Sequence, residues 1–370
     1  MHPFDSAFLQ AALLIASPLL FVALGELLSE TGGVINVGLE GMMLVGAFVG
    51  FWAGAESGNT WLAVLMGMVS GAVMAAIMGI ATIEARANQI VVGVALNIVG
   101  AGVSVFAFHK YTDNRSNLFI DRMRPLDVPG LRSIPLVGPA LFRQIPLVYI
   151  SVVIVPVVWI AYYKTRWGLR LRAAGELPEA DETVGVSVRS LRWQGVLIAG
   201  ALAGLGGAFL SVGLVGTFLN GMTAGRGFLA LAAVIVGGWR PLGVALAAML
   251  FGAADALQLR LQAESFVPRS VWIAIAILVT AYLIHLHVRG TRLRANSAAP
   301  RRGLDVELVV GLVLVAGAII LAFAQPRVSL PSQLWLALPY VLTIAALAGL
   351  IVRVRQPSAL AIPFVRGGGV

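Results

Sequence analysis

The chain of 370 residues is 59% hydrophobic and only 12% charged, whereas soluble domains are about half apolar and about a quarter charged. Several apolar runs reach the ~20 residues that cross a bilayer, so we expect an all-α, polytopic integral membrane protein in contact with lipid. The net charge of +9 then reflects basic residues that flank membrane helices rather than a nucleic-acid surface, and without cysteine no disulfide forms; we expect no metal and no cofactor.

The N-terminal stretch carries no Lys or Arg, and the first basic residue of the chain is Arg86. A secretory signal peptide needs a positively charged start, so we expect residues 7–29 to form a membrane span that is retained. Gly32 and Gly33 follow this span and predict a break in the helix.

Residues 32–54 form an apolar segment that is rich in glycine and holds two polar side chains, Asn36 and Glu40. These residues are four apart, so they share one face of a helix. A carboxylate at membrane depth costs about 2.5–3.5 kcal/mol on insertion scales, and irregular backbone there must be buried in protein. We therefore predict a broken or close-packed segment, in which Glu40 accepts hydrogen bonds, for example from backbone amides of a neighbouring broken helix.

Two further spans are predicted at residues 60–83 and 89–108, with Asn97 in the middle of the second. Residues 110–145 then form a long polar connection with several prolines, which is too basic to cross the membrane. We expect a small surface helix at most within this connection. The chain returns through the membrane at residues 146–163.

A charged insert at residues 164–192 separates two apolar helices; it is basic at both ends and acidic in the middle. Pro178 stands where a helix can begin, acidic residues follow it in the first turn, and Gly185 lies beyond the end. This pattern predicts a helix of roughly two turns outside the membrane. Such an element suits the docking of a cytoplasmic partner. An ordinary cytoplasmic loop that follows the positive-inside rule has a similar composition, however.

The span predicted at residues 193–219 carries small residues at every fourth position, namely Gly200, Gly204 and Ala208. A stripe of this kind lets another helix approach closely.

The rest of the chain is predicted to cross the membrane several more times and to end in a cytoplasmic tail at residues 353–370. The remaining spans are expected at residues 221–238, 242–259, 268–287, 305–323 and 334–352. Residues 1–370 then form a single transmembrane domain of about ten spans. With the charged insert in the cytoplasm, most of the Lys and Arg residues fall on the cytoplasmic side, as the positive-inside rule requires.

Polar residues at membrane depth are the candidates for a solute pathway, because such groups are costly in lipid and face cavities or other helices. The candidates are Asn36, Glu40, Asn97, Asp255 and Gln258. Each also has a plainer interpretation, as a cap of a broken helix or a hydrogen bond between helices. For an uncharged solute we expect Asn36 and Asn97 to bind it directly, and Glu40 to have a structural or gating role.

Several stretches resemble one family of transport proteins. Residues 174–186, with the sequence AGELPEADETVGV, are similar to the coupling loop of ABC-importer permeases. Residues 33–43, GVINVGLEGMM, resemble the nucleoside-type branch of the permeases for branched-chain amino acids, simple sugars and nucleosides, the branch that works with basic membrane lipoproteins. Residues 225–235, 239–243 and 254–262 are similar to the same group.

This resemblance implies a permease subunit in the bacterial plasma (inner) membrane that forms half of a translocation pathway for a small polar solute. Nucleosides are the first expectation, followed by simple sugars and branched-chain amino acids. The implied partners are a cytoplasmic ATP-binding subunit, a second and different permease subunit, and an extracytoplasmic solute-binding protein. Coupling to the ATP-binding subunit is assigned by this resemblance to Gly175, Glu176, Pro178, Ala180, Glu182, Thr183 and Gly185.

The sequence gives no sign of an enzyme. It contains no phosphate-binding loop of the G-x-x-x-x-G-K-[ST] type and no hydrolase motif, so we expect ATP to be hydrolysed by a separate subunit. The alternative from another class is an ion-coupled secondary transporter, which needs buried carboxylates or histidines along its pathway. Glu40 and Asp255 leave this alternative open.

Overall fold

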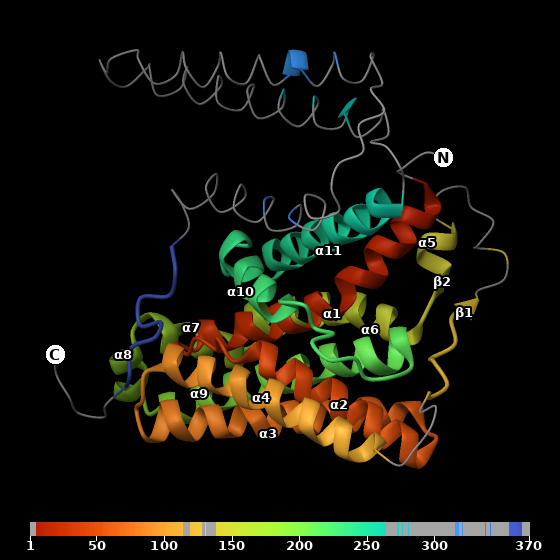
Figure 1. Ribbon diagram of the computed structural model, residues 1–370. Helices are drawn as coiled ribbons and strands as arrows, with labels where there is room; N and C mark the ends of the chain where they lie inside the picture. Colours follow the sequence, from red (N-terminus) through yellow and green to blue (C-terminus); the bar gives the residue numbers. More distant parts are fainter. Residues whose placement is uncertain are drawn as a thin grey trace. The chain divides into compact units, whose positions relative to one another are not determined.

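The structure, a computed structural model, describes residues 5–113, 119–127, 138–263 and 355–364, together with Gly130 and isolated positions between 272 and 341. The described part is mostly helical (Figure 1). The chain divides into two compact units, one of residues 1–8 with 257–338 and one of residues 9–256 with 339–370. Almost all of the described residues belong to the second unit.

Among the described residues, six helices are long and apolar enough to cross a membrane, and they coincide with predicted spans. They are α1 (Ser6–Thr31), α3 (Thr60–Gly79) continued by the π-helical turn η1 (Ile80–Glu84), α4 (Gln89–Thr112), α6 (Pro146–Lys164), α9 (Val188–Ala208) continued by η3 (Phe209–Val215), and α11 (Pro241–Ala263). Apart from isolated positions, the spans predicted at residues 268–287, 305–323 and 334–352 lie outside the described residues, so the number of about ten stays a prediction.

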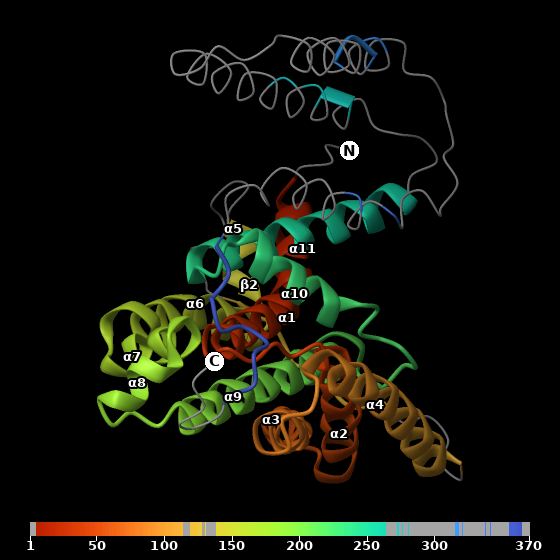
Figure 2. The ribbon, with the colours of Figure 1, turned by 90° about the vertical axis from the view of Figure 1, so that its left-hand side faces the viewer.

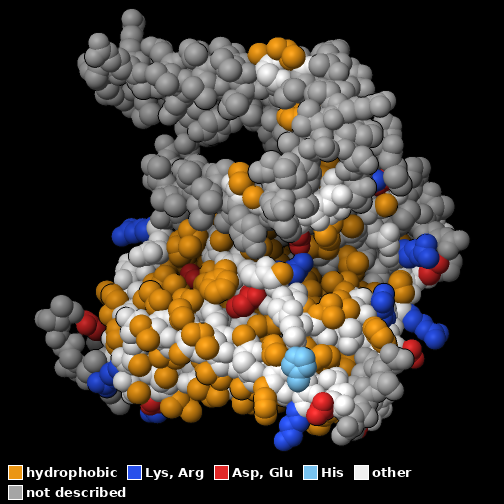
Figure 3. All heavy atoms as spheres, viewed as in Figure 1, with side chains coloured by type: hydrophobic (Ala, Val, Ile, Leu, Met, Phe, Trp, Pro, Cys, Tyr) orange, Lys and Arg blue, Asp and Glu red, His pale blue; other side chains and the backbone are white. Residues whose placement is uncertain are grey.

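The surface of these helices has the composition expected of a lipid-facing surface. Large apolar side chains such as Val73, Ile77, Val91 and Ile98 are exposed on α3 and α4. Figure 3 shows hydrophobic side chains covering much of the face formed by these helices, with Lys and Arg gathered toward its edges. This distribution agrees with helices that face lipid along their length and water at their ends.

Two segments differ in length from their predicted spans. The helix α2 (Leu39–Ser57) begins only after a non-helical loop, residues 32–38, which confirms the predicted break after α1. The span predicted at residues 221–238 is wrong, because it contains only α10 (Arg226–Val236), an 11-residue helix about 16 Å long. Glycines at 216, 221 and 225 adopt left-handed φ angles of 80°, 69° and 79°, which end the preceding helix and delay the next one.

A short β-ribbon departs from the all-α prediction. Strands β1 (Leu126–Asp127) and β2 (Arg143–Gln144) pair in antiparallel register within the long polar connection, which also holds the expected small helix, α5 (Gly138–Phe142). The Gln144 side chain donates to the carbonyl oxygens of Gln10, at 3.0 Å, and Ala140, at 2.9 Å. Side-chain bonds to the start of α1 therefore hold this ribbon in place.

The charged insert contains two helices, α7 (Arg166–Glu176) and α8 (Pro178–Thr183). The second is the predicted one: it begins at Pro178, and Gly185 follows it with a left-handed φ of 78°. The first was not predicted, because its basic residues obscure an amphipathic pattern that buries Leu171 and Ala174. The hydroxyl of Thr165 caps α7 by accepting a 3.0 Å hydrogen bond from the Gly168 amide.

The helix α9 packs against α2 and α3 through glycine (Figure 2). A Cβ atom added at Gly204 would lie 2.1 Å from the carbonyl oxygen of Gly67, and one added at Gly200 would lie 2.6 Å from that of Gly71. Such separations leave no room for any side chain. The predicted close approach along this stripe is confirmed.

We expect Gly204→Ala to lower the unfolding temperature in detergent, because the new methyl group must push α3 away from α9. Overpacking of this kind costs about 1–3 kcal/mol. The matched control is Gly102→Ala on α4, where an added Cβ meets nothing within 4 Å. Since alanine favours both helices equally by about 1 kcal/mol, equal unfolding temperatures for the two variants would contradict the packing argument.

Candidate functional site

The loop between α1 and α2 is held by buried polar side chains. The backbone amide of Asn36 donates to Oε1 of Glu26 at 2.7 Å, and the side-chain Oδ1 of Asn36 accepts from the backbone amide of Gly38 at 3.0 Å. The Ile35 amide donates to Oε1 of Gln89 at 2.8 Å. Because irregular backbone at membrane depth must find partners inside the protein, these bonds are what allow the helix to break here.

Asn97 fixes the start of α2 from the neighbouring helix α4. Its Oδ1 accepts from the Gly41 amide at 2.8 Å, and its Nδ2 donates to the Val37 carbonyl at 2.9 Å. The two backbones nearly touch, since a Cβ atom added at Gly100 would lie 2.6 Å from the Cα of Gly41. The polar atoms of Asn97 are therefore used by the broken segment itself.

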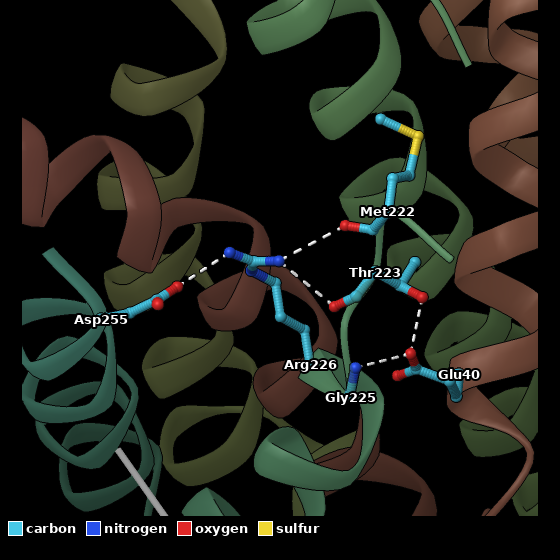
Figure 4. Close-up of polar contacts among 6 residues, drawn as sticks. All are labelled: Glu40, Met222, Thr223, Gly225, Arg226 and Asp255. Carbon is cyan, nitrogen blue, oxygen red and sulfur yellow. Dashed lines mark hydrogen bonds and ion pairs between the residues drawn. The ribbon is translucent and has the colours of Figure 1, made fainter. Parts of the chain in front are cut away.

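Glu40 accepts three hydrogen bonds at the beginning of α10, and Figure 4 shows those from Thr223 and Gly225. Its Oε1 accepts from the Thr223 hydroxyl at 2.6 Å and the Gly225 amide at 2.8 Å, and its Oε2 accepts from the Gly227 amide at 2.7 Å. The positive end of the helix dipole also favours a carboxylate at this place. The prediction that Glu40 bonds backbone amides of a neighbouring broken helix is confirmed.

Arg226 joins the same network to α11. Its guanidinium forms an ion pair with Asp255 at 2.8 Å, and the two side chains are only 19% and 23% exposed. The same group also donates to the Thr223 carbonyl at 3.2 Å. Arg226 was not among the predicted residues, because a basic residue between two glycines at the end of a span reads as part of a loop.

The predicted pathway residues thus fall into connected groups. Asn36 and Asn97 frame the start of α2. Glu40 lies one residue before Gly41, whose amide Asn97 binds, and it links α2 to α10. Arg226 of α10 then continues the connection to Asp255. Gln258 is buried one turn beyond Asp255 on α11 and belongs to neither group.

The predicted coupling residues lie on and around α8. The Thr183 hydroxyl donates to the Ala180 carbonyl at 2.8 Å, and the Gly185 amide donates to the Glu182 carbonyl at 3.0 Å, so both residues close the helix. Ala180 is exposed, and the apolar residues Leu177 and Val184 at the two ends of α8 are 61% and 74% exposed. The outer surface of α8 therefore combines acidic groups with exposed apolar side chains.

Gly175 and Glu176 lie at the end of α7 and have different surroundings from α8. A Cβ atom added at Gly175 would lie 2.0 Å from the Thr31 carbonyl, so this glycine packs directly on the end of α1. Glu176 is exposed, and its Oε2 accepts from the Ser358 hydroxyl at 2.9 Å. These two residues connect the charged insert to the rest of the protein.

Asp181 was not predicted as a coupling residue, yet it is the carboxylate of α8 that the fold buries. Burial raises the pKa of Asp181 above its ordinary value, although the charge of Arg170 acts in the opposite direction. Asp181 therefore lies on the side of α8 that packs against the protein and is not part of its exposed surface.

The family described as "Branched-chain amino acid transport system / permease component" matches residues 8–284, which include α1 to α11. No solved structure matches the chain.

Individual relatives carry related names. The chain is 40% identical over 262 residues, 71% of its length and 80% of the relative, to TsgC13 of Haloferax volcanii, whose name assigns it provisionally to glucose transport. It is 38% identical over 247 residues, 65% of its length and 78% of the relative, to the nucleoside ABC transporter permease NupC of Lactococcus lactis. It is 30% identical over 370 residues, 98% of its length and 97% of the relative, to the guanosine ABC transporter permease NupQ of Bacillus subtilis. A second Lactococcus lactis nucleoside permease, NupB, is 28% identical over 254 residues, 63% of the chain and 67% of the relative.

We expect Glu40→Leu to destabilise the protein strongly, because three donors lose their acceptor and each buried unpaired donor costs about 1–3 kcal/mol. The stability of Glu40→Gln should lie between those of Glu40→Leu and the parent, since the NH2 of the new amide faces one of the backbone donors and cannot accept from it. Unfolding in detergent measures the order of stabilities. Thr223→Val is the matched control: it removes the hydroxyl donor and leaves both backbone bonds intact. A Glu40→Leu variant as stable as the Thr223→Val variant would contradict the capping role.

Proposed function

Because the chain belongs to the permease family of the branched-chain amino acid transport systems, we propose that it carries nucleosides across the membrane with energy from a separate ATPase subunit. It is a multi-pass protein of the plasma membrane and a permease subunit of an ABC importer of the nucleoside and sugar group. Family membership gives no support to the alternative of an ion-coupled secondary transporter.

The choice of a nucleoside rests on the relatives and on the charges near the broken helices. The relative that matches over 98% of the chain is named for guanosine, and NupC is named for nucleosides. In addition, the charge of Glu40 is compensated by hydrogen bonds from backbone amides at the start of α10, and that of Asp255 by its ion pair with Arg226. A pathway beside these groups presents little uncompensated charge, which suits an uncharged, polar solute better than a charged one.

The pathway itself is proposed to run beside the junction of α2 and α10. Broken helices at membrane depth line binding sites in other transporters, and α10 is about 16 Å long, half the thickness of a membrane. Glu40, Arg226 and Asp255 would hold this junction in shape. Asn36 and Asn97 would support it from behind, since their side chains bind the backbone of the broken segment.

Energy coupling is proposed to run through α8. The chain has no phosphate-binding loop, so ATP must be hydrolysed by another subunit. A helix of two turns that exposes Leu177, Ala180 and Val184 between acidic residues suits a groove on such a subunit.

The second permease of the importer is proposed to be a different chain. Two nucleoside permeases of Lactococcus lactis, NupB and NupC, both resemble this protein, and the identity is 28% to one and 38% to the other. This difference favours a heterodimer in which the present chain takes the place of NupC. A solute-binding protein on the outer side would deliver the nucleoside.

We expect Ala180→Arg to abolish stimulated ATP hydrolysis and uptake while the permease stays folded, because a long charged side chain on the exposed face of α8 blocks docking. Co-purification of the ATPase subunit with the permease measures docking directly. Phe119→Ser, which changes another exposed residue (71%) outside the charged insert, in the connection after α4, is the control. Normal co-purification and uptake with Ala180→Arg would remove α8 from the proposed interface.

The proposed solute is tested by reconstituting the importer, with its ATPase, second permease and binding protein, in vesicles. We expect ATP-dependent uptake of labelled guanosine or another nucleoside, competed by unlabelled nucleosides and not by leucine. Uptake that is competed by glucose and not by nucleosides would move the protein to the sugar branch. Uptake that continues without ATP and stops with a protonophore would contradict the ATP-driven mechanism.

A further inference from the structure

The C-terminal segment, residues 355–364, lies across three elements that carry the proposed function. It runs beside α7 and the beginning of α9 (blue in Figure 2). Pro357 and Ala359 are buried, and Leu360 and Phe364 pack against the main hydrophobic core. We call residues 355–364 the strap.

The strap is bonded to the end of α7. The Ala359 amide donates to the Gly175 carbonyl at 2.8 Å, and both the hydroxyl and the amide of Ser358 donate to Oε2 of Glu176, at 2.9 and 3.4 Å. One of the residues that it holds, Gly175, also packs directly on the end of α1. Any movement of α7 therefore acts on the strap.

The strap is also bonded to the loop that breaks α1 from α2. The Ala361 amide donates to the Gly33 carbonyl at 3.1 Å. Ala361 adopts a left-handed φ of 63°, which an alanine accepts only where its surroundings impose it. Gly33 lies three residues before Asn36, in the loop whose far end is fixed by Asn97.

Arg192 provides the third anchor, at the start of α9. This side chain is only 3% exposed, its Nη1 donates to the Ile362 carbonyl of the strap at 2.8 Å, and its guanidinium lies 5.9 Å from the centre of the Phe364 ring. Its Nε and Nη2 have no hydrogen-bond partner among the described residues. A buried guanidinium is costly without acceptors, so the strap supplies the acceptor that keeps Arg192 in place.

We propose that the strap is a positioning segment for energy coupling, which transmits movement of α7 and α8 to the broken segment between α1 and α2. The proposal rests on the proposed function, because it takes α8 as the contact with the ATPase. Without the strap, the end of α7 still packs on α1 and its loop through Gly175 and Leu171, but the hydrogen bonds that tie Gly175, Glu176 and Gly33 to one segment are lost. The ATPase would then still bind and hydrolyse ATP, but its movement would reach the broken segment less completely.

The test compares two truncations in the reconstituted importer, one that ends the chain at residue 354 and one that ends it at residue 364. The first removes every strap contact, and the second removes residues 365–370 and keeps them all. We expect the shorter chain to lose about tenfold in uptake per ATP hydrolysed, within the usual range of coupling between sites. The longer chain should keep the parent ratio.

The outcomes separate this proposal from the proposed function. If the parent shows no ATP-dependent uptake, the proposed function fails. If the parent transports and both truncations keep its ratio, or both lose it equally, the strap proposal is overturned.

A point variant covers the case in which the shorter chain does not fold. Ala359→Pro removes the amide that bonds Gly175, and we expect it to lower the ratio of uptake to ATP hydrolysis. Ala359→Gly keeps this amide and should keep the parent ratio. Equal ratios for the two variants would overturn the proposal.

Discussion

The fold depends on satisfying backbone groups wherever a helix breaks inside a membrane. Two helices of this protein, α2 and α10, begin at such breaks, and the first amides of a helix have no partner within it. Each start is served by a side chain from another helix: Asn97 of α4 binds the Gly41 amide, and Glu40 of α2 binds the Gly225 and Gly227 amides. Because Glu40 precedes Gly41 in the chain, the bond that fixes the start of α2 also positions the side chain that fixes the start of α10.

These two connected caps explain why a charged residue is tolerated at membrane depth. Glu40 accepts three hydrogen bonds, and the neighbouring charge of Arg226 is neutralised by Asp255. The polar groups that make the segment costly in lipid are therefore the ones that hold its parts together.

The sequence was informative where a pattern has one physical cause. Apolar length fixed the position of long helices such as α3 and α9, the stripe of Gly200 and Gly204 indicated close packing, and Pro178 with Gly185 marked α8. The break before α10 was harder to place than the one after α1, because an apolar run around α10 looks the same whether it crosses the membrane or stops halfway. The partners of Glu40 and the bonds of the strap lie more than 150 residues away along the chain, and no local pattern encodes them.

The glycine contacts between α9, α2 and α3 also have a mechanical consequence. Where backbones touch without side chains between them, the helices cannot slide past one another, so this group behaves as a stiff rod. The 28 residues from Val188 to Val215 make a rod of about 42 Å. By the same helix geometry, a tilt of about 10° at one end moves the other end by about 7 Å. A rotation about a point near the charged insert would therefore displace the opposite end of the rod far more than the end beside the insert.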